Sequence, residues 1–183
     1  PNTSPSTSTL KALDNKFALA SSKSACDFAL FFGASSENVS EATIAGERSY
    51  VAGLKIYMGS STGNLLVSDV QSQLKHFASF PERKVLAVHA ESEEAMHFFL
   101  SQFTQDNIFV HNKVRNSLVS ALATSQALRL AESLKRKLHV CHCSTAREIE
   151  LVAQAKKRFP LVSSEVTPHH VFLNDESLST LKN

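Results

Sequence analysis

Apolar and polar positions along the chain follow two patterns, which alternate from one segment to the next. Short apolar runs of strand length, rich in β-branched and aromatic residues, recur between longer segments in which apolar residues return every three or four positions. The short runs predict strands at residues 26–33, 53–59, 85–89, 137–142 and 161–166. The longer segments predict helices at residues 10–23, 37–52, 67–80, 92–104, 117–134 and 145–158, with a loop at 105–116.

Strands that alternate with helices of 10–18 residues predict an α/β fold with a parallel sheet, either doubly wound or closed into a barrel. The chain has 183 residues, which suits a single domain with a sizeable core. Neither a GxGxxG nor a P-loop pattern is present, so the sequence does not favour a nucleotide-binding site.

Composition excludes several classes of partner. The net charge is +2 with the charges mixed along the chain, so we expect neither nucleic acid nor a membrane surface as a partner. No apolar run approaches the roughly 18 residues of a membrane span, and no signal-peptide pattern is present. Three cysteines do not make a disulfide framework, so we expect a reducing, cytoplasmic setting.

Two of the predicted strands end in histidine. His89 is the last residue of one strand, and His142 is at the end of the next. Shortly after His142, Ser144-Thr145 and Glu148 form the pattern of a capping box, which predicts the start of a helix. The carboxyl ends of parallel strands are where such folds hold ligands and metals, and imidazole suits zinc-class metals. Each histidine alone is more often a hydrogen-bonded core residue, but the matching positions favour a shared site.

Lys55 stands in the middle of an apolar strand, where an unpaired charge would cost several kcal/mol. One interpretation is that the side chain extends along the strand to solvent. The other is functional: CO2 adds to the amine, and the resulting carbamate bridges two metal ions.

The remaining histidines and cysteines are interpreted more plainly. His139 is expected on the opposite face of its strand from His142, as a structural residue. Cys141 and Cys143 are expected to be small packing residues on the other side from His142, and not ligands. The role of the pair His169-His170 stays open, and three further histidines in helical or loop contexts are expected at the surface: His76, His97 and His111.

Five short motifs, in this order, resemble the dihydroorotases of the amidohydrolase superfamily. They are Pro1-Asn-Thr, Gly53-Leu-Lys-Ile-Tyr-Met-Gly59, Val88-His-Ala-Glu91, His139-Val-Cys-His-Cys-Ser-Thr-Ala146 and Glu165-Val-Thr-Pro-His-His170. The resemblance runs essentially from end to end. Within the superfamily, the first and last motifs favour dihydroorotase over hydantoinase, dihydropyrimidinase and allantoinase.

The resemblance implies a (β/α)8 barrel with a binuclear zinc site at its carboxyl face. It implies that Lys55 is the carboxylated lysine bridging two zinc ions, that His89 and His142 are metal ligands, and that Asn2 binds the substrate carboxylate. The implied reaction is the reversible cyclisation of N-carbamoyl-L-aspartate to L-dihydroorotate in pyrimidine biosynthesis. A homodimer, or an aspartate transcarbamoylase partner, is the implied assembly.

The chain also departs from the family. The His-x-His pair of the first strand and the aspartate of the eighth, ligand and general base, are absent, and such barrels typically need about 250 residues. We therefore expect residues 1–183 to be the central part of one barrel, about strands three to seven, inactive by itself. Asn116 follows Arg115 where the family often has proline. The alternatives are a non-catalytic scaffold beside aspartate transcarbamoylase, or a cyclic amidohydrolase for another ring.

Overall fold

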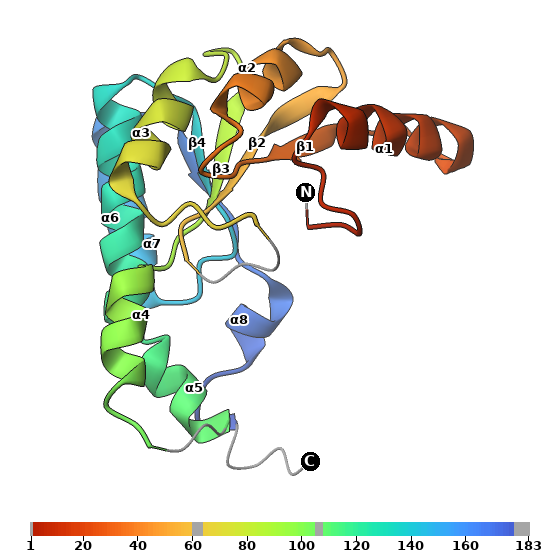
Figure 1. Cartoon of the computed structure of the whole chain (residues 1–183). Helices are drawn as coiled ribbons and strands as arrows, with labels where there is room; N and C mark the ends of the chain where they lie inside the picture. Colours follow the sequence, from red (N-terminus) through yellow and green to blue (C-terminus); the bar gives the residue numbers. More distant parts are fainter. Residues whose placement is uncertain (1, 60–63, 105–107, 178–183) are drawn as a thin grey trace.

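The computed structural model describes residues 2–59, 64–104 and 108–177, and its centre is a five-stranded parallel sheet (Figure 1). The strands lie side by side in chain order: β1 (Leu30–Gly33), β2 (Val51–Tyr57), β3 (Val85–His89), β4 (Leu138–Val140) and β5 (Val162–Ser164). A doubly wound sheet reverses its strand order at a switch point, and this one does not. The order is that of a barrel wall.

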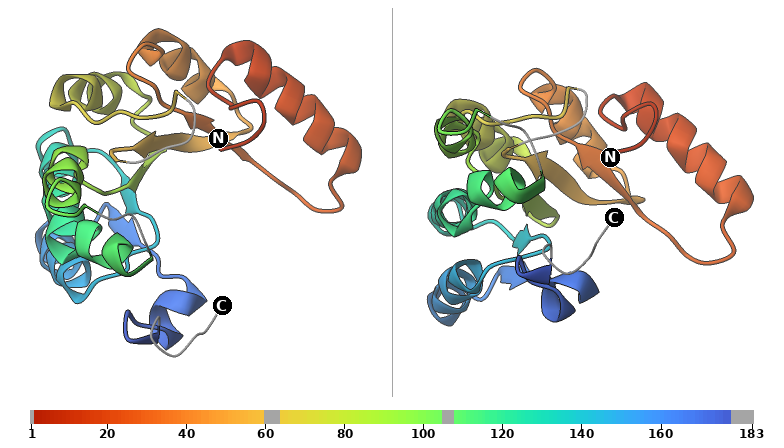
Figure 2. Two further views of the ribbon diagram at one scale, coloured as in Figure 1. Left: turned by 60° about the horizontal axis from the view of Figure 1, so that its bottom comes forward. Right: turned by 90° about the horizontal axis from the view of Figure 1, so that it is seen from below.

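Most of the helices lie along one side of the curved sheet, as the two views of Figure 2 show. Their bounds are α1 (Leu10–Lys23), α2 (Val39–Glu47), α3 (Val70–Ser79), α4 (Glu93–Leu100), α5 (Ile108–Val114), α6 (Ser117–Ser133), α7 (Ala146–Arg158) and α8 (Pro168–Phe172). The predicted α/β fold of partial-barrel type is confirmed. No helix among the described residues is long and apolar enough to cross a membrane.

The structure corrects several predicted bounds. The helix predicted over 37–52 ends early because Arg48 N–H bonds back to Ala45 O, and β2 then begins at Val51, two residues sooner than predicted. The strand predicted from residue 26 begins only at Leu30. The loop predicted over 105–116 contains helix α5, and a further short helix, α8, follows the last strand.

Alternation along the strands separates the core from the opposite face of the sheet. Positions of one parity are fully buried against the helices: Leu54, Ile56, Leu86, Val88, Leu138 and Val140. Positions of the other parity form two rows, one of Lys55, Ala87 and His139 and one of Tyr57 and His89. The apolar face holds the fold together, so the other face and the carboxyl ends of the strands are left for a site.

Candidate metal centre and its cleft

His89 is the last residue of β3, and its side chain leaves the sheet at the carboxyl edge as predicted. Its partner in register is Tyr57, the last residue of β2, and the two ring centroids are 5.9 Å apart. The imidazole is therefore placed by strand pairing between its neighbours, with its ring at the end of the inner face of the sheet.

His142 reaches the same place by another route. Strand alternation continued from Leu138 and Val140 would put His142 on the helix-covered face. Instead β4 ends at Val140, and His142 has φ 38°, in the left-handed region where histidine is among the few enriched side chains. The flanking backbone is held on both sides, since Cys141 N–H bonds to Val88 O and Cys143 N–H to Glu165 O.

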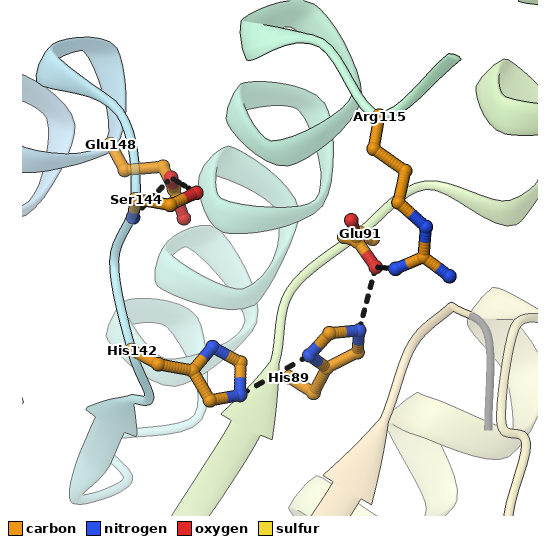
Figure 3. Close-up of polar contacts among 6 residues, drawn as sticks. All are labelled: His89, Glu91, Arg115, His142, Ser144 and Glu148. Atoms are coloured by element: carbon orange, nitrogen blue, oxygen red, sulfur yellow. Dashed lines mark hydrogen bonds and ion pairs between the residues drawn. The ribbon is translucent and has the colours of Figure 1, made fainter. Parts of the chain in front are cut away.

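The two imidazoles face each other, with 3.3 Å between Nδ1 of His89 and Nε2 of His142 (Figure 3). Two nitrogens bound to one tetrahedral zinc at about 2.0–2.1 Å would lie roughly 3.3–3.4 Å apart, by simple trigonometry. Burial, with the charges of Lys55 and His89, lowers the pKa of His142, so its ring is neutral at neutral pH. Neutral, convergent imidazoles fit a zinc-class ion.

Lys55 lies on the face of β2 that carries these rings and is 9% exposed. Its Nζ is 5.1 Å from the centroid of the Tyr57 ring. Within the described ranges, no carboxylate lies at ion-pair distance from this amine. The side chain is buried and is not extended into solvent. A buried amine without a carboxylate partner fits the carbamate that the resemblance implies.

Behind His89 lies an ionic network that the sequence motifs did not assign. Nε2 of His89 is 2.7 Å from a carboxylate oxygen of Glu91, and Nη1 of Arg115 is 2.6 Å from the same oxygen (Figure 3). Burial tends to raise the pKa of Glu91, but the hydrogen bonds and charges of His89 and Arg115 outweigh it and hold that pKa below its usual value. The carboxylate is therefore ionised at neutral pH.

These residues open into a cleft of about 880 Å³ at the carboxyl edge of the sheet. The segments that follow the strands supply its walls, and Thr145 is one of the lining residues. Thr145 and Glu148 form the predicted capping box at the start of α7. His169 and His170, in α8, also line it, and Nδ1 of His170 is buried without a partner among the described residues. Both histidines of the Thr-Pro-His-His motif thus face the cleft side of the molecule.

Asn2 lies at the start of the described chain and is exposed. Five residues later, Thr7 O accepts the backbone N–H of Gly33, the last residue of β1. That bond holds the segment at the carboxyl edge of the sheet, the edge that carries His89 and His142. The role of Asn2 with substrate stays a prediction.

The expected faces of the neighbours of His142 need correction. His139 is on the same row as Lys55, not on the face opposite the site, because alternation stops at Val140. Ligand-type atoms of His139, Cys141 and Glu165 lie within 4.8 Å of one another, and His139 also bonds to Ser163. Cys141 is therefore a half-buried residue of this cluster and not simple packing, whereas Cys143 is buried as expected.

Two other residues were misjudged or left unexplained by the sequence. His76, expected at the surface, is 1% exposed, and its Nε2 donates to Ser35 O. His76 lies beside Phe77 on the buried face of helix α3. Asn116 caps α6 by accepting from the backbone N–H groups of Leu118 and Val119, which explains an asparagine at this position.

In sequence, the chain is 32% identical over 183 residues to the multifunctional protein CAD of Squalus acanthias, covering 99% of this chain and 7% of that protein. It is 32% identical over 176 residues to the dihydroorotase of Thermococcus kodakarensis, covering 96% of this chain and 37% of that enzyme. The chain thus spans well under half the length of the curated relatives it matches. The predicted resemblance to dihydroorotases is confirmed. No protein-family model matches the chain.

In structure, the chain is similar to the L-hydantoinase (dihydropyrimidinase) of Arthrobacter aurescens, with a TM-score of 0.89 and 23% identity, over 98% of this chain and 41% of that one. It is also similar to the inactive dihydroorotase-like domain of the CAD-like multifunctional protein of Chaetomium thermophilum, with a TM-score of 0.67 and 22% identity over 96% and 42%. These likenesses establish the fold.

Proposed function

Because the chain resembles dihydroorotases from end to end, we propose that it is the central part of a zinc-dependent dihydroorotase, about strands three to seven of one barrel domain. The observation that supports this most directly is the convergence of His89 and His142 at 3.3 Å beside the buried Lys55. A scaffold that binds no metal gains nothing from two facing imidazoles and a lysine buried without a carboxylate.

His89, His142 and a carboxylated Lys55 would hold the zinc ions. When bound, they would supply Lewis-acid chemistry at an amide carbonyl and a nucleophile at neutral pH. The chain's own residues do the rest. The strand ends orient the ligands, the buried Lys55 amine would take up CO2, and Asn2 would bind a carboxylate of N-carbamoyl-L-aspartate or L-dihydroorotate at the carboxyl edge. The three free cysteines fit a cytoplasmic setting.

The test uses the full-length protein that contains this chain. We expect it to copurify with zinc and to interconvert N-carbamoyl-L-aspartate and L-dihydroorotate, and His142→Ala to abolish both properties. His97→Ala is the matched control, because His97 is a solvent-exposed histidine of α4 whose ring lies 3.4 Å from a carboxylate oxygen of Glu93. A zinc-free wild-type protein without turnover would contradict the proposal.

A scaffold function is the second candidate, and it is favoured by the likeness to the inactive domain from Chaetomium thermophilum. Copurification of an aspartate transcarbamoylase with a metal-free full-length chain would support it. A homodimer is the corresponding expectation for the enzyme.

A third candidate is a cyclic amidohydrolase that uses the same chemistry on a different cyclic substrate, as the likeness in fold to L-hydantoinase allows. Replacement of Asn2 by alanine distinguishes it. The KM for dihydroorotate should rise at least tenfold, on the scale of one lost charged hydrogen bond of about 1.5–3 kcal/mol, if Asn2 binds the substrate carboxylate. An unchanged KM would count against dihydroorotate as the substrate.

A further inference from the structure

Arg115, Glu91, His89 and His142 form one continuous chain of polar contacts (Figure 3). Its successive distances are 2.6 Å from Arg115 to Glu91, 2.7 Å from Glu91 to His89, and 3.3 Å from His89 to His142. The side chains are half-buried to buried, with 30% of Arg115, 15% of Glu91 and 17% of His89 exposed. Solvent therefore screens these contacts less than it screens a surface ion pair.

The geometry fixes which nitrogen of His89 carries the proton. An imidazole that binds a metal through one nitrogen keeps one N–H on the other, and a carboxylate accepts a hydrogen bond from it. Because Nε2 faces the carboxylate of Glu91, the proton belongs on Nε2, and the lone pair of Nδ1 is directed toward His142. Without the carboxylate, nothing among the described contacts of His89 prefers this tautomer to the one with the proton on Nδ1.

We propose that Glu91, clamped by Arg115, is the positioning residue that fixes the tautomer and ring orientation of His89 for metal binding. The inference rests on the proposed metal site and adds to it the two residues that prepare one of its ligands. A carboxylate behind a ligating histidine makes the imidazole a better ligand, and removal of such a partner typically weakens metal affinity 10–100-fold.

The surrounding elements hold this pair in place. Arg115 stands between α5 and α6, where its own N–H bonds to His111 O and the next residue, Asn116, caps α6. The backbone of Glu91 lies against Gly59 after β2 so closely that a Cβ on Gly59 would be 2.5 Å from Glu91 O. The carboxylate is thus positioned from two directions, by a helix junction and by the end of a neighbouring strand.

The experiment measures the zinc Kd of the full-length protein by competition with a chelator, without any substrate. Glu91→Gln keeps the size of the side chain and removes its charge, and we expect the Kd to rise 10–100-fold. Glu94→Gln is the matched control, because it removes the same charge from an exposed glutamate in the first turn of α4, near Glu91. Its Kd should stay within twofold of wild type.

A second reading separates positioning from general damage. In the zinc-free protein labelled with 15N-histidine, the His89 ring should show the tautomer protonated on Nε2, and Glu91→Gln should show a mixture of both tautomers. Arg115→Met should raise the zinc Kd as well, and Arg115→Lys, which keeps the charge, should recover part of the loss. A purely structural role would not move the tautomer.

A zinc Kd for Glu91→Gln within twofold of wild type, with an unchanged tautomer, would overturn the proposal. If Glu91→Gln does not fold, Arg115→Met decides in the same way. A wild-type protein that binds zinc but does not convert dihydroorotate would contradict the proposed function and leave this inference intact. A wild-type protein that binds no zinc would overturn both.

Discussion

His89 and His142 face each other across the ends of neighbouring strands, yet they are held by different means. His89 is held through its side chain, by the ionised carboxylate of Glu91 and, behind it, Arg115. His142 is held through its backbone, at φ 38° between two hydrogen bonds to the adjoining strands. One imidazole is oriented by charge, and the other by a backbone conformation that costs about 1–2 kcal/mol for a residue with a Cβ.

The difference predicts that the two sides of the site respond differently to change. Substitutions in the ionic network should change the orientation of the His89 ring and leave that of His142 unchanged. Substitutions that relieve the positive φ should change the free energy of unfolding only when they are made at position 142. Backbone strain of this kind persists where the surrounding structure enforces it, and it gathers at functional sites. All variants below are made in the full-length protein that contains this chain.

Removal of either imidazole should give the largest effect. We expect His89→Ala and His142→Gly each to weaken zinc binding by more than about 100-fold, beyond the 10–100-fold typical of a partner that only supports a ligand. The two variants should differ in the free energy of unfolding of the zinc-free protein. His142→Gly should raise it by up to about 1 kcal/mol, because glycine adopts positive φ without strain.

His89→Ala should instead lower that free energy by about 1–3 kcal/mol, because it removes a hydrogen-bond partner from the half-buried Glu91. Chemical denaturation of zinc-free proteins measures both changes. Equal losses of stability in the two variants would remove the distinction between a histidine held by charge and one held by its backbone.

Gly59→Ala should damage the His89 side through sterics. The new Cβ would meet Glu91 O at 2.5 Å, so the backbone that carries the carboxylate must shift, at a typical cost of about 1–3 kcal/mol. We expect lower stability together with weaker zinc binding. Gly46→Ala is the matched control, since its Cβ would be 2.5 Å from Cδ of Pro81, away from the site. Gly46→Ala should lower stability and leave the zinc Kd unchanged.

His76 offers a reference histidine with a structural role. Burial lowers its pKa below the usual 6.5, and the hydrogen bond to Ser35 only partly opposes this. Between the folded pKa and about 6.5 the unfolded chain binds the extra proton, so stability falls as pH falls and is fully present above about 6.5.

The contribution of His76 should follow a slope of at most about 1.4 kcal/mol per pH unit, the value for one proton. His76→Gln, which can still donate to Ser35, should flatten the profile of unfolding free energy against pH over this window. Superimposable profiles for the wild type and the variant would show that His76 is not the group responsible.

Thiol reactivity gives the smallest expected effect and probes the chain on either side of His142. Burial raises the pKa of Cys143 to about 11, which leaves almost no thiolate at pH 8. We expect iodoacetamide to label exposed Cys26 first, half-buried Cys141 more slowly, and Cys143 only on unfolding. Mass spectrometry of the labelled peptides reports the order, and early labelling of Cys143 would show that this backbone opens.

The sequence by itself determined the features that depend on neighbours along the chain. The alternation of strands and helices follows from local hydrophobic periods. The capping box follows from the three-residue spacing of Thr145 and Glu148, and the strand-end position of His89 follows from the apolar run before it. The position of Lys55 inside an apolar strand was likewise read from the sequence, whereas the burial of its side chain came from the structure.

Only the tertiary structure decided what depends on residues far apart. Glu91 and Arg115 are separated by 24 positions, and no local pattern pairs them. His76 looked like a surface residue because its partner is Ser35, 41 positions away. His142 faces His89 although strand alternation would turn it the other way, because hydrogen bonds to both adjoining strands stabilise its left-handed φ. Periodicity describes one element at a time, whereas a site is built from the ends of several.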